Sequence, residues 1–177
     1  ADAALDAALL VARAVVGPQA DDVALAVIAM GKTGARELNY ISDVDVVYVV
    51  GPAREPQGDH EPISEEHLVD VGTRLATELA HVVSATAPEP PLWPLDTALR
   101  PEGKDGALVR TLDSHLAYYR RWAASWEFQA LLKARACAGD LELGARYEQG
   151  VAPYVWEASR RENFVEDARA MRRRVEK

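Results

Sequence analysis

Apolar residues in the first part of the chain change from helical spacing to strand-like runs. Helical spacing relates Leu5, Ala8, Leu9, Ala12 and Val16. This pattern predicts a helix over residues 3–16, which ends at Gly17-Pro18. A continuous apolar run over residues 23–30 has the length of a buried strand, and a valine-rich run over 43–50 predicts a second one. We expect two buried strands close together in the chain.

The segments around these strands carry turn and helix signals. Residues 31–34 predict a turn, and residues 35–39 about one helical turn. Proline, glycine and charged residues predict a surface loop over 51–62. A capping-box pattern that starts at Ser64 opens a long helix to about residue 85. A third strand is expected over 92–99, followed by a turn at 101–106.

The rest of the chain, after Ala107, has a helical pattern throughout. We expect helices over 113–124 and 126–137, one from 141 with a break near Pro153, and a basic one over 165–177. The predicted fold class is α/β (α+β), a small mixed sheet with flanking helices followed by a helical C-terminal portion. We divide it into a catalytic core, residues 1–110, and a helical portion, 111–177.

The composition is that of a soluble globular protein. The 177 residues are 49% hydrophobic and 27% charged, enough for one full-sized core. The chain starts without Met and stops within a helical pattern, so we expect it to be a piece of a longer protein.

The charge and the cysteine content narrow the classes of function. A formal net charge of -8 disfavours a nucleic-acid partner, because binding a phosphate backbone needs a positive face. The single cysteine, Cys137, cannot form an internal disulfide or a cysteine-rich zinc site, which favours the reducing cytoplasm. We expect no membrane span and no secretion signal, since no apolar run is long enough and the N-terminus lacks basic residues.

The most informative local feature is Asp43-Val44-Asp45 at the head of the second strand. Residues two apart on a strand point to the same side, so the carboxylates of Asp43 and Asp45 project together. Two adjacent carboxylates repel each other, and a hard divalent cation such as Mg²⁺ removes that repulsion. The alternative is that two solvent-facing aspartates only begin an edge strand and discourage aggregation.

A glycine-bearing loop precedes these carboxylates and favours the metal site. Gly31-Lys32-Thr33-Gly34 follows the first strand, where backbone N–H groups can hold phosphate oxygens. The loop has neither the P-loop nor the Rossmann glycine spacing. A strand, a glycine turn, a short helix and then Asp-x-Asp instead resembles the nucleotidyltransferase superfamily, in which a third acidic residue on a later strand completes the site. Asp96 is the natural candidate.

Two longer blocks carry a more specific resemblance. Residues 31–45 read Gly-Lys-Thr-Gly-Ala-Arg-Glu-Leu-Asn-Tyr-Ile-Ser-Asp-Val-Asp, and residues 96–109 read Asp-Thr-Ala-Leu-Arg-Pro-Glu-Gly-Lys-Asp-Gly-Ala-Leu-Val. Both resemble blocks of the glutamine synthetase adenylyltransferase and adenylyl-removing enzyme family, and Tyr118-Tyr119 and residues 126–135 continue the match in order. Two positions depart from the family pattern: Ala35 replaces a usual glycine and Ala98 a usual arginine.

The resemblance implies a metal-dependent nucleotidyltransferase that acts on glutamine synthetase and controls nitrogen assimilation. Asp43, Asp45 and Asp96 would be catalytic and would bind Mg²⁺ or Mn²⁺, with AMP, ADP or ATP as the nucleotide. The sequences around Asn39-Tyr40, at residues 161–164 and at residues 171–176 are more similar to the N-terminal half of these enzymes. That half removes AMP from a tyrosine by phosphorolysis and releases ADP.

Other readings stay open. The chain could be the ATP-dependent adenylylating half, an antibiotic or small-molecule nucleotidyltransferase, or a non-catalytic module that binds nucleotide or glutamine synthetase. Further partners implied by the resemblance are a second nucleotidyltransferase domain in the same longer chain and a nitrogen-signalling regulatory protein.

Several other residues are candidates for binding nucleotide or phosphate. They are Gly31, Lys32, Gly34, Ser42, Arg100, Lys104, Lys133 and Arg135. Lys133 and Arg135 could equally lie on a solvated helix face, and Ser42 could simply cap its strand. The four histidines lack metal-ligand spacing, so packing explains them better than catalysis.

Overall fold

The computed structural model describes residues 1–40, 42–54, 62–85, 93–160 and 164–175. The described helices are α1 (Asp2–Val16), α2 (Gly31–Gly34), α3 (Glu65–Ser84), α4 (Leu112–Arg121), α5 (Ser125–Leu131), α6 (Leu141–Ala158) and α7 (Phe164–Val175). The strands are β1 (Val23–Ala29), β2 (Val44–Pro52), β3 (Leu95–Asp96), β4 (Val109–Thr111) and β5 (Arg135–Gly139).

The strands form one small mixed sheet. β1 lies antiparallel between β2 and β5. The other edge of β2 pairs in parallel with β3 near its start and with β4 near its end. The predicted small mixed sheet with flanking helices is confirmed.

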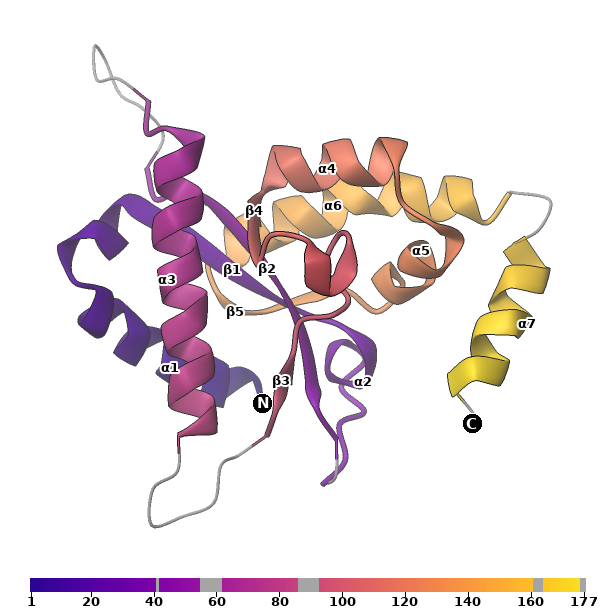
Figure 1. The fold of residues 1–177 in the computed structure, drawn as a ribbon, viewed down its shortest axis with the longest axis horizontal. Coiled ribbons are helices and arrows are strands. Elements are labelled where there is room, and N and C mark those ends of the chain that lie inside the picture. Colours follow the sequence, from indigo (N-terminus) through magenta and orange to yellow (C-terminus); the bar gives the residue numbers. More distant parts are fainter. Residues whose placement is uncertain (41, 55–61, 86–92, 161–163, 176–177) are drawn as a thin grey trace.

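Helices cover both faces of the sheet, with α1 and α3 on one side and α4, α5 and α6 on the other (Figure 1). Every residue of β1 is buried, which explains its unbroken apolar run. Along β2, Val44, Val46, Tyr48 and Val50 join the core under α1 and α3. Val47 and Val49 join the core under α4, α5 and α6. Because side chains alternate along a strand, Asp45 lies on the second face.

The early elements agree with the sequence pattern. The helix over 3–16 and the first two strands are confirmed as α1, β1 and β2. The long helix α3 begins where the capping pattern places it, with the Ser64 hydroxyl accepting a hydrogen bond from the His67 N–H at 3.2 Å.

Two predictions near the first loop and the sixth helix are wrong. The helical turn lies at Gly31–Gly34, so it begins four residues before the predicted turn at 35–39. Arg36, which comes after it, has a positive φ of 60°. No break occurs at Pro153, because α6 continues through it from Leu141 to Ala158.

The prediction that everything after Ala107 is helical is also wrong. β4 lies in that region, and the predicted helix 126–137 ends as α5 at Leu131 before the chain becomes β5. The β5 sequence Arg-Ala-Cys-Ala-Gly has little strand propensity, so pairing with β1 decides its conformation. Cys137 is buried on this strand, and burial raises the pKa of its thiol to about 12.

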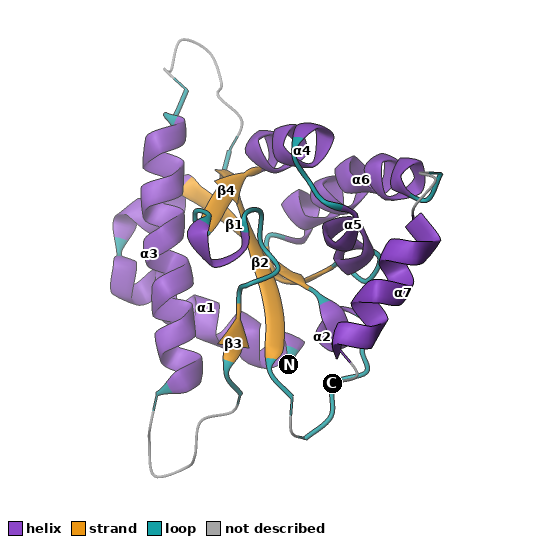
Figure 2. Ribbon diagram, turned by 45° about the vertical axis from the view of Figure 1, so that its right-hand side comes forward, coloured by secondary structure: helices purple, strands orange, loops and turns teal. Residues whose placement is uncertain are grey.

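Some predictions fall outside the described residues. They concern most of the loop 51–62, the start of the third strand at residue 92, and residues 161–163; within 93–99, only Leu95 and Asp96 form a strand. Figure 2, turned from the first view, shows α7 beside α5, on the side of the sheet that α4 and α6 cover. Among the described residues, no helix combines the length and the apolar character required to cross a bilayer.

Candidate metal and nucleotide site

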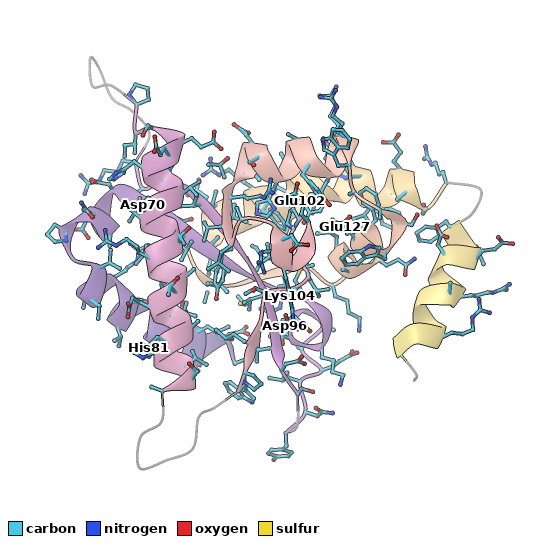
Figure 3. All side chains as sticks on the ribbon, in the orientation of Figure 1. Asp70, His81, Asp96, Glu102, Lys104 and Glu127 are labelled. Atoms are coloured by element: carbon cyan, nitrogen blue, oxygen red, sulfur yellow. The ribbon has the colours of Figure 1, made fainter. Side chains whose placement is uncertain are left out.

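The three predicted carboxylates come together at one end of the sheet. Asp45 and Asp96 are directly paired across β2 and β3, and Asp43 comes one residue before β2 begins. One ligand oxygen from each lies within 4.8 Å of the others. Asp43 is exposed, whereas Asp45 and Asp96 are partly buried. Figure 3 labels Asp96, which lies on β3 beside the start of β2.

The electrostatics of this group fit a divalent cation. Burial, and then the charges of Asp43 and Asp96, raise the pKa of Asp45 to about 6, although Lys32 opposes the shift. Three carboxylates this close therefore repel one another near neutral pH. Oxygen donors at this spacing are the ligands that Mg²⁺ and Mn²⁺ prefer, and such an ion would offset the repulsion.

Gly31 lets the backbone approach the carboxylates. Its φ is +51°, a conformation that side chains other than hydrogen disfavour. A Cβ at this position would collide with the Asp45 carboxylate. The loop after β1 therefore lies directly against Asp45.

Three polar side chains continue the site along this loop. The Lys32 ammonium donates to the Ser42 hydroxyl at 3.4 Å, and that hydroxyl donates to the Asn39 side-chain oxygen. Lys32 is exposed, and its charge acts on Asp45. Lys32 and Ser42 thus lie together beside the carboxylates, which is the arrangement expected of phosphate-binding groups.

Asp96 is held by its own turn. One of its carboxylate oxygens accepts the N–H of Ala98 at 2.7 Å. Any residue except proline at position 98 can supply that donor. The alanine that departs from the family pattern is therefore compatible with this contact. Ala35 has an ordinary φ of -74°, so its backbone does not require the usual glycine.

Gly34 and Arg135 have structural partners. Gly34 is buried, and a Cβ on it would collide with the carbonyl of Lys133. The Arg135 guanidinium binds the Asp2 carboxylate at 2.8 Å and 3.1 Å and the carbonyls of Thr33 and Gly34 at 3.2 Å. These bonds join α1, α2 and β5.

Two further predicted lysines, Lys104 and Lys133, are exposed. Lys133 is exposed and pairs with Glu37 at 3.1 Å, which brings the end of α5 to the loop after α2. Lys104 is exposed, and its backbone carbonyl accepts a hydrogen bond from Arg100 at 2.9 Å. The Arg100 guanidinium is directed into its own loop rather than toward the carboxylates.

The sequence reasoning missed the roles of Glu37 and Asn39. Glu37 pairs with Lys133, and Asn39 binds Ser42. No periodicity marks either residue, since both lie in irregular chain between α2 and β2. Their signal was their place in the block of residues 31–45 that resembles the family, between the glycine turn and Asp-x-Asp.

Known proteins share this arrangement of blocks. Residues 1–150 match the glutamate-ammonia ligase adenylyltransferase family. The chain is 54% identical over 175 residues to a bifunctional glutamine synthetase adenylyltransferase/adenylyl-removing enzyme of Streptomyces avermitilis, covering 99% of this chain and 17% of that protein. It is 56% identical over 177 residues to the enzyme of that description from Nocardia farcinica, covering 99% of this chain and 16% of that one. The chain thus spans less than a fifth of the length of these relatives.

Proposed function

The chain belongs to the glutamate-ammonia ligase adenylyltransferase family, and from that premise we propose that it transfers AMP at a tyrosine of glutamine synthetase. One observation carries the proposal: the oxygens of Asp43, Asp45 and Asp96 converge beside the Gly31 loop. We further propose that the reaction removes AMP by phosphorolysis.

Asp43, Asp45 and Asp96 would hold Mg²⁺ or Mn²⁺. When bound, the cation neutralises phosphoryl oxygens and so stabilises the charge that develops in the transition state. The three carboxylates would fix the position of the cation. Because Gly31 has no side chain, the backbone of its loop can lie directly against the Asp45 carboxylate. Lys32 and Ser42 would contact phosphate oxygens, because their side chains are hydrogen-bonded to each other and the Lys32 charge acts on Asp45.

In the proposed direction, an oxygen of inorganic phosphate forms a bond to the AMP phosphorus. The bond between that phosphorus and the tyrosyl oxygen breaks, the tyrosine takes up a proton, and ADP leaves. The reverse-sense alternative, attack of a tyrosine hydroxyl on the α-phosphorus of ATP with release of pyrophosphate, would use the same carboxylates. The family-like sequence at Asn39-Tyr40 favours removal of AMP. The Ser42 hydroxyl donates a hydrogen bond to the Asn39 side-chain oxygen, which brings this part of the chain to the site.

The relatives' length suggests the setting of this chain. Because it covers less than a fifth of each relative, we propose that a second nucleotidyltransferase domain lies in the same polypeptide and catalyses the opposite reaction. We also propose that the protein is cytoplasmic and that a nitrogen-signalling protein controls it.

The test is release of ADP from glutamine synthetase that carries labelled AMP, on addition of this chain, phosphate and Mg²⁺. We expect labelled ADP that depends on both phosphate and the cation. Asp45→Asn, which keeps the shape of the side chain but removes a charged ligand, should abolish the release. Asp70→Asn is the matched control, since Asp70 is exposed on α3 and belongs to no part of the site.

A second assay measures the opposite reaction, the transfer of AMP from labelled ATP to unmodified glutamine synthetase. If no ADP appears, but unmodified glutamine synthetase becomes labelled from ATP, the proposed direction is wrong and the site assignment survives. Equal ADP release by the chain and by Asp45→Asn would overturn the site assignment.

A further inference from the structure

The loop between β3 and β4 starts directly after Asp96. Both strands pair with the same edge of β2, where Asp45 is opposite Asp96 and Tyr48 is opposite Val109. Only Val46 and Val47 separate those pairings on β2, so residues 97–108 must fold back on themselves. How that loop folds decides where Asp96 lies, because β3 is only two residues long.

Arg100 fills the interior of this loop. Its Nε donates to the carbonyl of Gly106 at 3.0 Å and its Nη2 to the carbonyl of Lys104 at 2.9 Å. Its Nη1 donates to the carbonyl and the hydroxyl of Thr97 at 2.8 Å and 2.9 Å. Four bonds occupy most of the five donors that a guanidinium offers. Both ends of the loop are thereby tied to one side chain.

Glu102 fixes the outer part of the loop to α4. It has a positive φ of 63°, which is unfavourable for a residue with a side chain and persists only where the surroundings hold it. Its N–H donates to the Tyr118 hydroxyl at 3.3 Å, and its carboxylate pairs with Arg110. The Arg110 guanidinium also lies 5.8 Å from the centre of the Tyr118 ring. Figure 3 shows Glu102 in this loop, beyond Lys104 from Asp96.

We propose that Arg100 is a positioning residue that sets the Asp96 carboxylate for the cation, with Glu102 as the anchor of its loop. Thr97, which follows Asp96 directly, is bound twice by Arg100. The Asp96 carboxylate accepts the N–H of Ala98, the next residue along. Arg100 therefore fixes Thr97, which lies between Asp96 and the Ala98 N–H that the Asp96 carboxylate accepts. The inference rests on the proposed function, since it concerns the affinity of the proposed metal site.

The experiment measures Mn²⁺ binding by the chain, from the loss of the free Mn²⁺ signal in electron paramagnetic resonance. Arg100→Lys keeps the charge but cannot make the four bonds of the planar fork. We expect its affinity for Mn²⁺ to fall roughly 10-fold or more, as for other residues that orient metal ligands. Arg74→Lys on α3 is the matched control, because Arg74 makes a surface hydrogen bond to Gln19 and should keep full affinity.

Glu102→Gly provides a variant that keeps the loop conformation. Glycine adopts a positive φ without strain, so this change removes the ion pair to Arg110 and leaves the backbone favourable. We expect weaker Mn²⁺ binding, while circular dichroism and the melting temperature of the metal-free chain report an intact fold.

The results separate this inference from the proposed function. Absence of Mn²⁺ binding by the unsubstituted chain overturns both. If the chain and Arg100→Lys bind Mn²⁺ equally, while the KM for phosphate rises in Arg100→Lys, Arg100 contacts phosphate and the positioning role is wrong. Normal Mn²⁺ affinity in Glu102→Gly would remove Glu102 from the mechanism.

Discussion

At the scale of single residues, the charged carboxylate of Asp45 carries an electrostatic cost in the folded chain. Its pKa is raised to about 6, so the penalty is complete above pH 6 and disappears below the ordinary value of 3.8. We expect Asp45→Asn to stabilise the metal-free chain at pH 8 by roughly 1 kcal/mol after solvent screening. Urea unfolding in EDTA measures this gain.

The same substitution should remove the response to metal. Mg²⁺ should raise the melting temperature of the unsubstituted chain, because a ligand that binds only the folded state stabilises it. Asp45→Asn should show no such rise, whereas Asp70→Asn should behave like the unsubstituted chain.

The pH dependence tests the electrostatic explanation of the stability gain. If Asp45→Asn stabilises the metal-free chain as much at pH 4 as at pH 8, that explanation is wrong.

Gly31 combines a backbone requirement with a steric one. Gly31→Ala should lower stability by about 1–3 kcal/mol, because alanine disfavours a φ of +51° and its methyl group would push the Asp45 carboxylate aside. Gly17→Ala is the comparison, since Gly17 also has a positive φ but open space around it. Both should melt earlier in differential scanning calorimetry, and only Gly31→Ala should also weaken Mn²⁺ binding.

At the scale of elements, α6 continues through a proline that the sequence pattern treated as a break. Pro153 is exposed, lacks the N–H that would bond to the carbonyl of Gln149, and crowds that carbonyl. Pro153→Ala should stabilise the chain by about 1–3 kcal/mol in urea unfolding. Pro18→Ala should bring no gain, because Pro18 starts a short 3₁₀ helix where no N–H is needed. A loss of stability in Pro153→Ala would show that the proline fits its helix without strain.

The elements that could be predicted were those with strong local signals. α1 and α3 have helical periodicity with a glycine stop or an N-cap, β1 is an apolar run and β2 a valine-rich run of strand length, and each is confirmed. β5 has no such signal, because its alanines and glycine form a strand only where β1 offers an open edge. β4 is three residues long and is likewise set by pairing with β2.

At the scale of the whole molecule, His115 links stability to pH. It is fully buried between β2 and α6, with its Nε2 3.2 Å from the carbonyl of Tyr48. Burial lowers the pKa of His115 from 6.5 to about 4. The unfolded chain therefore takes up a proton first as the pH falls. His115 should cost up to about 3 kcal/mol of stability as the pH falls from 6.5 to 4.

Urea unfolding at pH 7 and pH 4.5 tests this dependence. His115→Gln should flatten the loss, since glutamine does not titrate there, while the same exchange at the exposed His81 should not. The Asp45 carboxylate acts in the opposite sense over pH 6 to 3.8, so the comparison is made in the Asp45→Asn background. An unchanged slope in His115→Gln would assign the acid sensitivity to other groups.

The division of the chain at residue 110 stays a prediction, and the sheet suggests how its two parts cooperate. β5 and the helices that cover Ile28, Val47 and Val49 all come from the second part. A chain that ends at residue 110 should lose cooperative unfolding and self-associate, because it exposes this face and one edge of β1. A chain that ends at residue 160 should unfold cooperatively. Size-exclusion chromatography and urea unfolding distinguish the two, and a monomeric, cooperative 1–110 chain would establish an independent core.

The sequence by itself determined the local parts of this protein. The carboxylates of Asp43 and Asp45, the glycine turn before them and the caps of the helices are set by neighbours in the chain, so their patterns are readable. The resemblance to nucleotidyltransferases named Asp96 as the third carboxylate, but its place opposite Asp45 comes from strand pairing.

Only the tertiary structure decided what depends on distant partners. Arg135 was a phosphate candidate by sequence, yet its bonds to Asp2 join β5 to α1. Arg100 was another, yet it closes its own loop. A guanidinium binds whichever acceptors the fold brings within reach, and those acceptors are placed by pairing and packing between segments that the linear pattern leaves unrelated.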